Sequence, residues 1–266
     1  VGGSGLATVA EDIVALRRDH EVLVVHGGGP QTTALMERID LPVVKVAGRR
    51  VTDERTLACL LMAVGQVNAE LCAALLGAGG RPVGLHGASD AVIEATRRPP
   101  QRYPGHAEPA DLGLVGDVTA LNLALLRLLV DGGYLPVLAC VGASRSGQLY
   151  NINADVVANE IAARLEATAL VLVSDIVGVL RDVKDVASRI PVIDEDTGRR
   201  LIEEGVVSEG MIPKLEESFD AIRRGVGRVH IMGADEPGAL VRELAEPGSV
   251  GTSLVATAEK PSHDVT

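Results

Sequence analysis

The chain has 266 residues, of which 47% are hydrophobic and 23% are charged, so it can bury a substantial core. Its formal net charge of −11 supplies no basic face, which argues against a nucleic-acid or an anionic-membrane partner. An anionic substrate remains compatible with this charge, because it requires only a local cluster of positive side chains.

Strand-like apolar runs alternate along the chain with longer amphipathic segments. The sequence predicts strands at 21–25, 81–86, 134–141, 169–174 and 228–232, and helices at 6–20, 55–79, 119–133, 154–167 and 212–225. The region 94–117 is rich in Pro, Gly and charge, and we expect it to leave the sheet as a hairpin. Near-continuous apolar strands separated by helices predict an α/β fold with a mostly parallel sheet covered on both faces.

The longest stretch without Asp, Glu, Lys or Arg is VLVVHGGGPQTTALM, which is too short and too interrupted by glycine to span a bilayer. No signal-peptide pattern opens the chain. Cys59, Cys72 and Cys140 are widely spaced in apolar surroundings, so we expect buried reduced thiols rather than metal ligands. These features predict a cytoplasmic protein.

The segment EVLVVHGGGPQ (21–31) ends a predicted strand on three glycines, Gly27, Gly28 and Gly29. Ligands bind at the carboxyl ends of parallel strands, and N–H groups without side chains at a helix N-terminus form an anion cradle. A tight turn would need only one glycine, so three glycines favour a ligand. Neither a P-loop nor a dinucleotide fingerprint is present. The α/β-hydrolases also use HGGG, but no serine here lies in the G-x-S-x-G elbow that they require.

Two further segments carry candidate anion contacts. VGGSG (1–5) is a second glycine loop, which together with the first would suit a polyphosphate held from two sides. GRRVTDERTL (48–57) contains Arg50, whose guanidinium could clamp a carboxylate. On that segment alone, helix capping by Thr52 or Asp53 beside solvated arginines is the favoured interpretation.

Polar residues also open two predicted helices. Asn151, Asn153 and Asp155 precede the helix at 154–167, and because one helix cap needs one side chain, three indicate a polar site as well. Lys214 follows a proline at a helix start, where a cation is electrostatically unfavourable. Only four of the 25 basic residues are lysines, so we expect an anionic ligand to compensate the charge of Lys214.

Several segments together resemble the amino-acid kinase family, and within it the enzymes that phosphorylate N-acetyl-L-glutamate. They keep the family's order from residue 1 to about 255: VGGS, VHGGGPQ, GRRVTDERTL, VGQVNAEL, DLGLVGDV, YNINADVVANEIA, LVLVSDIVGVL, GMIPK and VHIMGADEPGALVRELAEPGSVGT. The resemblance implies a three-layer αβα sandwich with a central, mostly parallel sheet. It also implies transfer of the ATP γ-phosphoryl group to the side-chain carboxylate of N-acetyl-L-glutamate, a step of arginine biosynthesis.

The resemblance further implies two lobes. Residues 1–160 would hold the acyl-amino-acid site and the dimer interface, residues 161–256 would bind ATP, and 257–266 would form a disordered tail. Mg²⁺ would arrive bound to ATP rather than in a protein metal site. A homodimer is expected, with a hexamer as the alternative.

Site residues carry over position by position. Lys214 would stabilise the transition state, Asp155 would orient that cation, and Gly3 and Gly28 would complete the catalytic set. Four residues would bind the substrate in addition to Gly28, namely Gly29, Arg50, Asn151 and Asn153. The nucleotide would be bordered by Ser174, Asp175, Gly178, Leu180, Ser208 and Gly210.

The implied chemistry suits these residue types. A carboxylate nucleophile is ionised at neutral pH, so the reaction requires no general base. It requires positioning and electrostatic stabilisation of an anion that approaches a polyphosphate. The three glycines are then expected to let backbone N–H groups touch the phosphoryl group during transfer.

The sequence departs from the family pattern at three places. Family members carry a lysine directly ahead of the position of Val1, so we expect the chain as written to fold but to turn over two or three orders of magnitude more slowly. The usual GLSG reads GLHG with His86, which we take as a tolerated variation. His230, Glu243 and Gly251 match positions of the feedback site in arginine-inhibited members. Those members form hexamers through an additional N-terminal helix, so arginine feedback is a hypothesis here.

Two alternative functions remain open. A sibling kinase could act on carrier-protein-linked aminoadipate or glutamate in lysine biosynthesis, but it would show a basic face near the cleft, and the acidic total speaks against it. The chain could also be a catalytically impaired, nucleotide-binding regulatory homologue.

Overall fold

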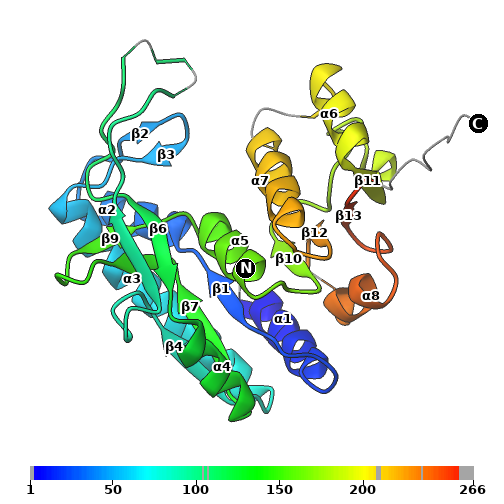
Figure 1. The fold of residues 1–266 in the computed structure, drawn as a ribbon, viewed down its shortest axis with the longest axis horizontal. Helices are drawn as coiled ribbons and strands as arrows, with labels where there is room; N and C mark the ends of the chain where they lie inside the picture. Colours follow the sequence, from blue (N-terminus) through cyan, green and yellow to red (C-terminus); the bar gives the residue numbers. More distant parts are fainter. Residues whose placement is uncertain (1–2, 104, 107, 208–210, 235, 258–266) are drawn as a thin grey trace, which may run out of the picture. The chain divides into compact units, whose positions relative to one another are not determined.

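In the computed structural model, which describes residues 3–103, 105–106, 108–207, 211–234 and 236–257, the chain folds into two units (Figure 1). One unit is the chain from Ile13 to Ala158, and the other is the chain up to Asp12 together with the chain from Asn159 onward. Both contain parallel strand pairs and helices, so the predicted α/β class is confirmed. Apart from residue 257, the predicted tail lies outside the described residues.

The unit from Ile13 to Ala158 is built on two sheets and a short ribbon. The strand orders are β1-β7-β4, with all pairs parallel, and β6-β5-β8-β9. Its elements are β1 (Val24–His26), α2 (Gly29–Arg38), β2 (Lys45–Val46), β3 (Arg49–Arg50), α3 (Glu54–Gly77), β4 (Pro82–Leu85), β5 (Ile93–Arg97), β6 (Gly116–Leu121), α4 (Leu123–Asp131), β7 (Leu135–Ala139), β8 (Val141–Ala143) and β9 (Leu149–Asn151).

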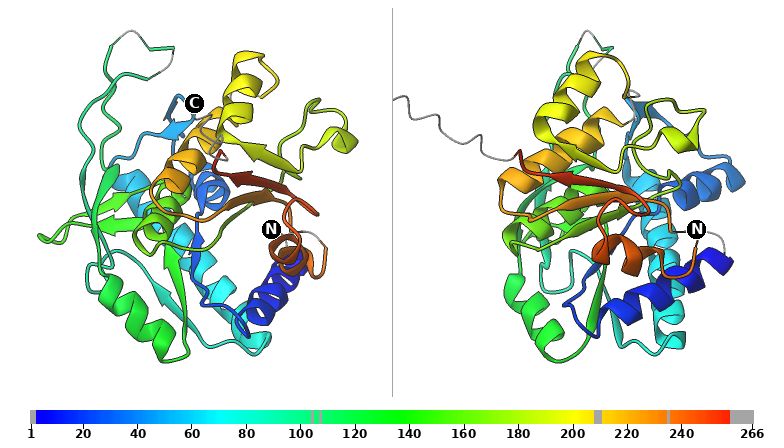
Figure 2. Two further views of the ribbon diagram at one scale, coloured as in Figure 1. Left: turned by 45° about the vertical axis from the view of Figure 1, so that its right-hand side comes forward. Right: turned by 90° about the vertical axis from the view of Figure 1, so that its right-hand side faces the viewer.

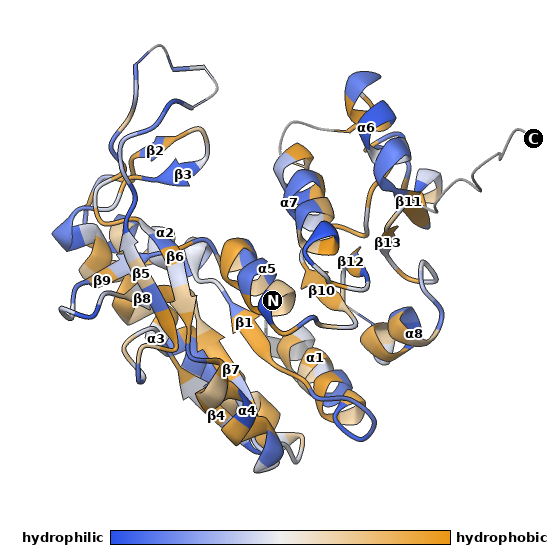
Figure 3. Ribbon diagram, in the orientation of Figure 1, coloured by the Kyte–Doolittle hydropathy of each residue, from blue (hydrophilic) through white to orange (hydrophobic). Residues whose placement is uncertain are grey.

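The central strand β7 explains why this sheet forms. All five of its residues are buried, and Val137 pairs with Val24 on one side and Gly84 on the other. Figure 3 shows hydrophobic residues concentrated along β7 and β4. The prediction of a single strand at 134–141 is wrong in one respect. The strand is interrupted at Cys140, and the residues after it form β8, which belongs to the second sheet. Apolar composition alone does not reveal such a change of sheet.

The excursion predicted at 94–117 is confirmed as a hairpin. β5 and β6 pair antiparallel, and in the connecting segment Tyr103, Leu112 and Val115 form a small buried cluster. The predicted helix at 119–133 starts too early, because β6 continues to Leu121. Asn122 sets the actual start of α4, since its side-chain oxygen accepts a hydrogen bond from Leu125 N at 3.0 Å.

The second unit is built on one mixed sheet with the order β10-β12-β13-β11. The outer pairs are parallel, whereas β12 and β13, side by side in both views of Figure 2, are antiparallel. Two helices, α1 (Gly3–Leu16) and α5 (Ala154–Arg164), contain the points at which the units divide. The remaining elements are β10 (Leu170–Val173), η1 (Val186–Ser188), β11 (Val192–Asp194), α6 (Glu195–Glu203), α7 (Ile212–Arg223), β12 (Val229–Met232), α8 (Ala239–Ala245) and β13 (Thr252–Val255).

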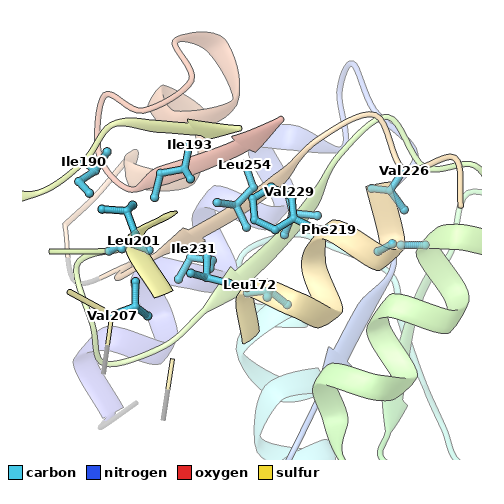
Figure 4. Packing of buried hydrophobic residues seen from close by; sticks show 14 of the residues in the cluster. Leu172, Ile190, Ile193, Leu201, Val207, Phe219, Val226, Val229, Ile231 and Leu254 are labelled. Carbon is cyan, nitrogen blue, oxygen red and sulfur yellow. The ribbon is translucent and has the colours of Figure 1, made fainter. Parts of the chain in front are cut away.

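The core of this unit lies between the sheet and its helices. Figure 4 shows Leu172 of β10, Ile231 of β12 and Phe219 of α7 packed in one cluster. Gly198 lets α6 approach closely, because a Cβ there would lie 2.6 Å from Cε2 of Phe219. Burial of side chains of this size contributes roughly 2 to 3 kcal/mol each, so this cluster holds the sheet and helices together.

A buried acid on α8 organises the loop that leads into β13. Glu243 is fully buried and accepts hydrogen bonds from Gly248 N, Val250 N and Gly251 N at 2.8 to 2.9 Å. Its fourth partner is His230 Nδ1 at 2.7 Å. Burial alone would raise the pKa of Glu243, but these hydrogen bonds lower it to about 2. The carboxylate therefore ties α8, β12 and the loop together.

Candidate functional site

A cavity of about 650 Å³ lies in the unit from Ile13 to Ala158. It is lined by the loop from β1 into α2, the β2–β3 ribbon, part of the hairpin and the segment that follows β9. Five residues predicted as substrate contacts line this one cavity, namely Gly28, Gly29, Arg50, Asn151 and Asn153. Residues far apart in the sequence thus form one concave surface, as a small-molecule site requires.

The three glycines after β1 differ in what surrounds them. A Cβ at Gly28 would lie 2.6 Å from Cγ1 of Val64 on α3, so close packing excludes a side chain there. A Cβ at Gly27 would make an ordinary contact with Ala154, and at Gly29 it would meet nothing within 4 Å. Our interpretation gave all three glycines one purpose. The structure assigns Gly28 to packing, while Gly29 leaves space open beside the cavity.

The start of α2 presents backbone donors at the cavity. The first N–H groups of a helix have no intrahelical acceptor, and they carry the positive end of the helix dipole. In the described part of the chain, the N–H of Gly28 has no protein acceptor. The geometry therefore suits an anion at this helix end.

Arg50 is fixed at the cavity wall by contacts with α2. Its guanidinium donates hydrogen bonds to Gly29 O at 3.0 Å, to Thr33 Oγ1 at 2.7 Å and to Met36 Sδ at 3.2 Å. Burial lowers the pKa of Arg50, but an arginine remains charged throughout the physiological range. Helix capping falls to Asp53, which accepts from Thr56 N at 2.7 Å. Capping and a pre-oriented guanidinium thus coexist in this segment.

The segment after β9 adds amides to the cavity. The side chain of Asn151 donates to Thr52 Oγ1 at 3.0 Å, and its backbone N–H donates to Leu114 O at 2.9 Å. Asn153 accepts a long hydrogen bond of 3.4 Å from Asp155 N at the start of α5. Asp155 itself lies in the first turn of α5 and is not among the residues that line the cavity.

The cavity carries a positive charge that the chain as a whole does not have. Four basic side chains line it, Lys45, Arg49, Arg50 and Arg98, against a single acid, Glu37. Our site prediction missed Lys45 and Arg98. Lys45 lies opposite Arg50 across the β2–β3 ribbon, and Arg98 enters from the hairpin, where Asp117 pairs with it at 2.6 Å. The AG pair at 47–48, with positive φ at both residues, was a turn signal that could have revealed the ribbon.

The predicted nucleotide residues lie in the other unit. Ser174 follows β10 and its N–H donates to Met232 O at 3.0 Å, and Asp175, Gly178 and Leu180 lie in the loop beyond it. Gly178 has φ +128°, and a Cβ there would lie 2.7 Å from Thr252 Oγ1. Lys214 lies in the first turn of α7, and Gly3 is the first residue of α1. Ser208 and Gly210 lie outside the described residues.

Cysteines and metal ligands give no second site in the described ranges. The three cysteines are free thiols; Cys59 and Cys140 are buried as predicted, whereas Cys72 is only partly buried. Burial raises the pKa of Cys140 to about 11. No group of three or more His, Cys, Asp or Glu side chains could hold a metal ion among the described residues. Within the same residues, α3 is the one helix long and apolar enough to span a membrane by length and composition, criteria that core helices also meet.

Comparisons with known proteins agree with this architecture. The model of the amino acid kinase family matches residues 1–233. The acetylglutamate kinase of Sorangium cellulosum (strain So ce56) is 58% identical over 258 residues, which cover 96% of this chain and 91% of the relative. The acetylglutamate kinase of Anaeromyxobacter dehalogenans (strain 2CP-C) is 54% identical, with 88% of each chain covered.

Solved structures share the fold. The N-acetylglutamate synthase of Neisseria gonorrhoeae, complexed with coenzyme A and N-acetyl-glutamate, has a TM-score of 0.81 and 25% identity, over 96% of this chain and 57% of that chain. The carbamate kinase of Giardia lamblia bound to AMP-PNP has a TM-score of 0.67 at 16% identity, over 94% of this chain and 89% of that chain, which shows a shared fold alone. Because the family model matches most of the chain, this chain belongs to the amino acid kinase family.

Proposed function

We propose that the chain transfers the γ-phosphoryl group of ATP to the side-chain carboxylate of N-acetyl-L-glutamate, giving N-acetyl-L-glutamyl 5-phosphate in cytoplasmic arginine biosynthesis. The observation that carries the proposal is the basic cavity at the start of α2 in an otherwise acidic chain. Relatives more than 50% identical over most of both chains are acetylglutamate kinases, which supports the same reaction.

The substrate carries two carboxylates and one neutral amide, and the cavity offers matching groups. Arg50, held in place by α2, would bind the α-carboxylate through its remaining N–H groups. Asn151 and Asn153 would hydrogen-bond the acylated amino acid. Gly28 and Gly29 would present N–H groups to the reacting end. This assignment puts the substrate in the unit from Ile13 to Ala158, which lies within the predicted 1–160 lobe, although the chain up to Asp12 belongs to the other unit.

The reaction needs no proton abstraction, because the attacking carboxylate is already ionised. The protein must hold two anions together and stabilise the charge that develops on the transferring group. Lys214 would supply a cation for this purpose, with Asp155 orienting it, and Gly28 would supply a backbone donor. Preorganised groups of this kind lower the barrier because they need not reorient during the reaction.

The residues of the other unit fit a nucleotide. The loop after β10 lies at the carboxyl end of a parallel strand pair, and its exposed Val173 and Val177 offer an apolar surface for a base. The first turn of α7 contains Lys214 and no acid, which suits a phosphate group. ATP supplies the phosphoryl group, and Mg²⁺ would arrive bound to its phosphates.

A substrate panel tests the proposed function. ADP release is measured with N-acetyl-L-glutamate, L-glutamate and N-acetyl-L-aminoadipate, with and without a lysine placed ahead of Val1. We expect ADP release with N-acetyl-L-glutamate and a faster rate in the version with the lysine. A preference for the aminoadipate derivative would instead favour the sibling kinase, and nucleotide binding without turnover in either version would favour the regulatory homologue.

Replacing Gly29 by alanine tests where the substrate lies. A methyl group at this position meets no protein atom within 4 Å, so the melting temperature should not change. The methyl would occupy space beside the cavity and displace the substrate. We therefore expect kcat/KM for N-acetyl-L-glutamate to fall at least about tenfold. Gly77→Ala, which also meets nothing within 4 Å, serves as the control. Equal kinetics in the two variants would remove Gly29 from the site.

We further propose that α3 forms a homodimer interface. The side chains of Met62 and Leu76 are 57% and 66% exposed on one helix, among small exposed residues. An exposed apolar stripe that extends along α3 from Met62 to Leu76 is typical of a protein–protein contact. In a two-fold symmetric dimer, the stripes of both subunits would be buried against each other.

Introducing a charge on α3 tests the dimer. We expect Met62→Glu to weaken the dimer about a hundredfold, because burying an unpaired carboxylate from each subunit costs several kcal/mol. The molar mass is measured by sedimentation across a concentration series. Leu128→Glu, at a leucine that is 69% exposed on α4, should leave the mass unchanged. A monomer before substitution, or the same mass for both variants, would contradict the interface.

A further inference from the structure

The ring of His26, the last residue of β1, lies between two partners that define its protonation. Its Nδ1 is 2.8 Å from the carbonyl oxygen of Gly27, and a carbonyl only accepts, so Nδ1 carries a proton. Its Nε2 is 2.9 Å from the amide nitrogen of Asn68 on α3, and an amide nitrogen only donates. Nε2 is therefore the acceptor, and the ring is the neutral tautomer protonated at Nδ1.

The amide of Asn68 is itself fixed. Its Nδ2 also donates to Val137 O of β7 at 3.1 Å, so a flipped amide would turn its oxygen toward that carbonyl. Gly84 on β4 leaves the room that this amide occupies, because a Cβ there would lie 2.1 Å from Asn68 Oδ1. Four segments of the unit thus hold the His26 ring in one orientation.

The orientation of this ring determines a feature of the cavity. A trans peptide is planar, so the carbonyl of Gly27 and the N–H of Gly28 point in opposite directions. Because His26 holds that carbonyl, it also sets the direction of the Gly28 N–H. Gly28 lines the cavity, and within the described ranges its N–H has no protein acceptor.

We propose that His26 is a positioning residue, whose neutral ring holds the Gly27–Gly28 peptide so that the Gly28 N–H is presented to the reacting anion. The identity of that anion rests on the proposed function. His26 touches neither substrate nor nucleotide in this account and acts only through the peptide.

Protonation of His26 would disturb this arrangement, because a proton on Nε2 would face the N–H of Asn68. Burial lowers the pKa of His26 below 6.5, opposed by its bond to Gly27. Two cysteines contact His26 or Asn68: Cys72 on α3 donates to Asn68 Oδ1, and the backbone N–H of Cys140 donates to His26 O. Burial raises the pKa of both thiols, so both are neutral at pH 7. The neutral ring is therefore kept at pH 7 and lost as pH falls through the lowered pKa, which places an acid limb of activity below pH 6.5.

Two substitutions test whether the hydrogen bond from His26 Nδ1 to Gly27 O matters, as distinct from the mere presence of a side chain at this position. The amide nitrogen of an asparagine can take the place of Nδ1 and donate to Gly27 O, whereas a glutamine can replace only Nε2. We expect His26→Gln to lower kcat about tenfold to a hundredfold with little change in KM for ATP. We expect His26→Asn to keep at least about tenfold more of kcat than His26→Gln and to lose the acid limb. Equal kcat in the two variants, or the same acid limb in His26→Asn, would overturn the proposal.

Nitrogen-15 NMR tests the inference without turnover. The His26 ring signals, identified by their loss in His26→Asn, should report a neutral ring protonated at Nδ1 at pH 7. The Gly28 amide signal should move in His26→Gln and stay near its position in His26→Asn. A ring protonated at Nε2, or a cation at pH 7, would overturn the inference. Absence of phosphoryl transfer in every version, with these signals as expected, would count against the proposed function alone.

Discussion

Replacing Lys214 by methionine is expected to lower kcat by about two to three orders of magnitude. The substitution removes a cation that we assign to stabilising the charge spread over the oxygens of the transferring phosphoryl group in the transition state. KM for N-acetyl-L-glutamate should change little, because the cavity that would bind it lies in the other unit. Fold stability should not fall either, since a cation in the first turn of a helix is electrostatically unfavourable.

Steady-state kinetics with both substrates and the melting temperature check this prediction. Lys184→Met is the matched control, because it removes the same charge from an exposed position outside the proposed site. We expect the control to keep the unmodified kcat. If Lys214→Met and Lys184→Met gave the same kcat, the catalytic assignment of Lys214 would be wrong.

The second large effect is expected at Glu243, where glutamine should destabilise the fold by about 3 to 5 kcal/mol. The carboxylate accepts hydrogen bonds from three backbone N–H groups and from His230. In the glutamine variant, the amide NH2 group would replace one acceptor oxygen and would itself point a donor at these N–H groups. Glu246→Gln, an exposed position one residue beyond α8, should stay within about 0.5 kcal/mol. Urea unfolding at pH 7 compares the two, and equal midpoints would contradict the account.

The same carboxylate predicts how stability depends on pH. Its pKa is about 2 in the folded chain, against an ordinary value of 4.5, so the folded state favours the ionised form. That contribution is fully present above pH 4.5 and is lost as pH falls toward 2. Unfolding midpoints measured between pH 5 and pH 3 should therefore fall less steeply in Glu243→Gln than in the unmodified chain.

The hydrogen bonds of Glu243 also bear on arginine feedback. The sequence resemblance associated Glu243, His230 and Gly251 with an arginine site. In the structure, Glu243 is fully buried and its two oxygens already accept four hydrogen bonds from His230 and the loop. Arginine could reach this carboxylate only by displacing those partners, so feedback remains a hypothesis.

One long amphipathic helix and several near-continuous apolar strands could be predicted from the sequence, whereas short elements of mixed composition could not. The apolar pattern of α3 and the runs at β4, β10 and β12 were sufficient to identify them. The predicted helix at 119–133 included the last three residues of β6, because the alternation of this strand is brief and merges with the leucines of α4. α6 and α8 were not predicted, since charged residues dominate α6 and α8 has only seven residues, too few for a clear helical period.

The candidate site divides in the same way. Gly28, Gly29, Arg50, Asn151 and Asn153 lie in local motifs, and the structure brings them to one cavity. Arg98 and Lys45 join them through a hairpin and a two-strand ribbon. Local patterns indicate both turns, but they do not show that these two side chains reach the same cavity as Arg50. The contact between His26 and Asn68 joins residues 42 positions apart in the chain, and it depends on the space left by a third residue, Gly84. Such pairings become visible only in the folded chain.

Trapping the reaction product with hydroxylamine tests the central claim most directly. The chain, with a lysine placed ahead of Val1, is incubated with Mg-ATP and N-acetyl-L-glutamate, and the acyl hydroxamate is measured beside ADP. Our account predicts equal amounts of both products, formation with N-acetyl-L-glutamate but not with L-glutamate, and a loss in Lys214→Met that matches its loss of kcat. ADP without hydroxamate, or hydroxamate formed equally well from L-glutamate, would contradict it.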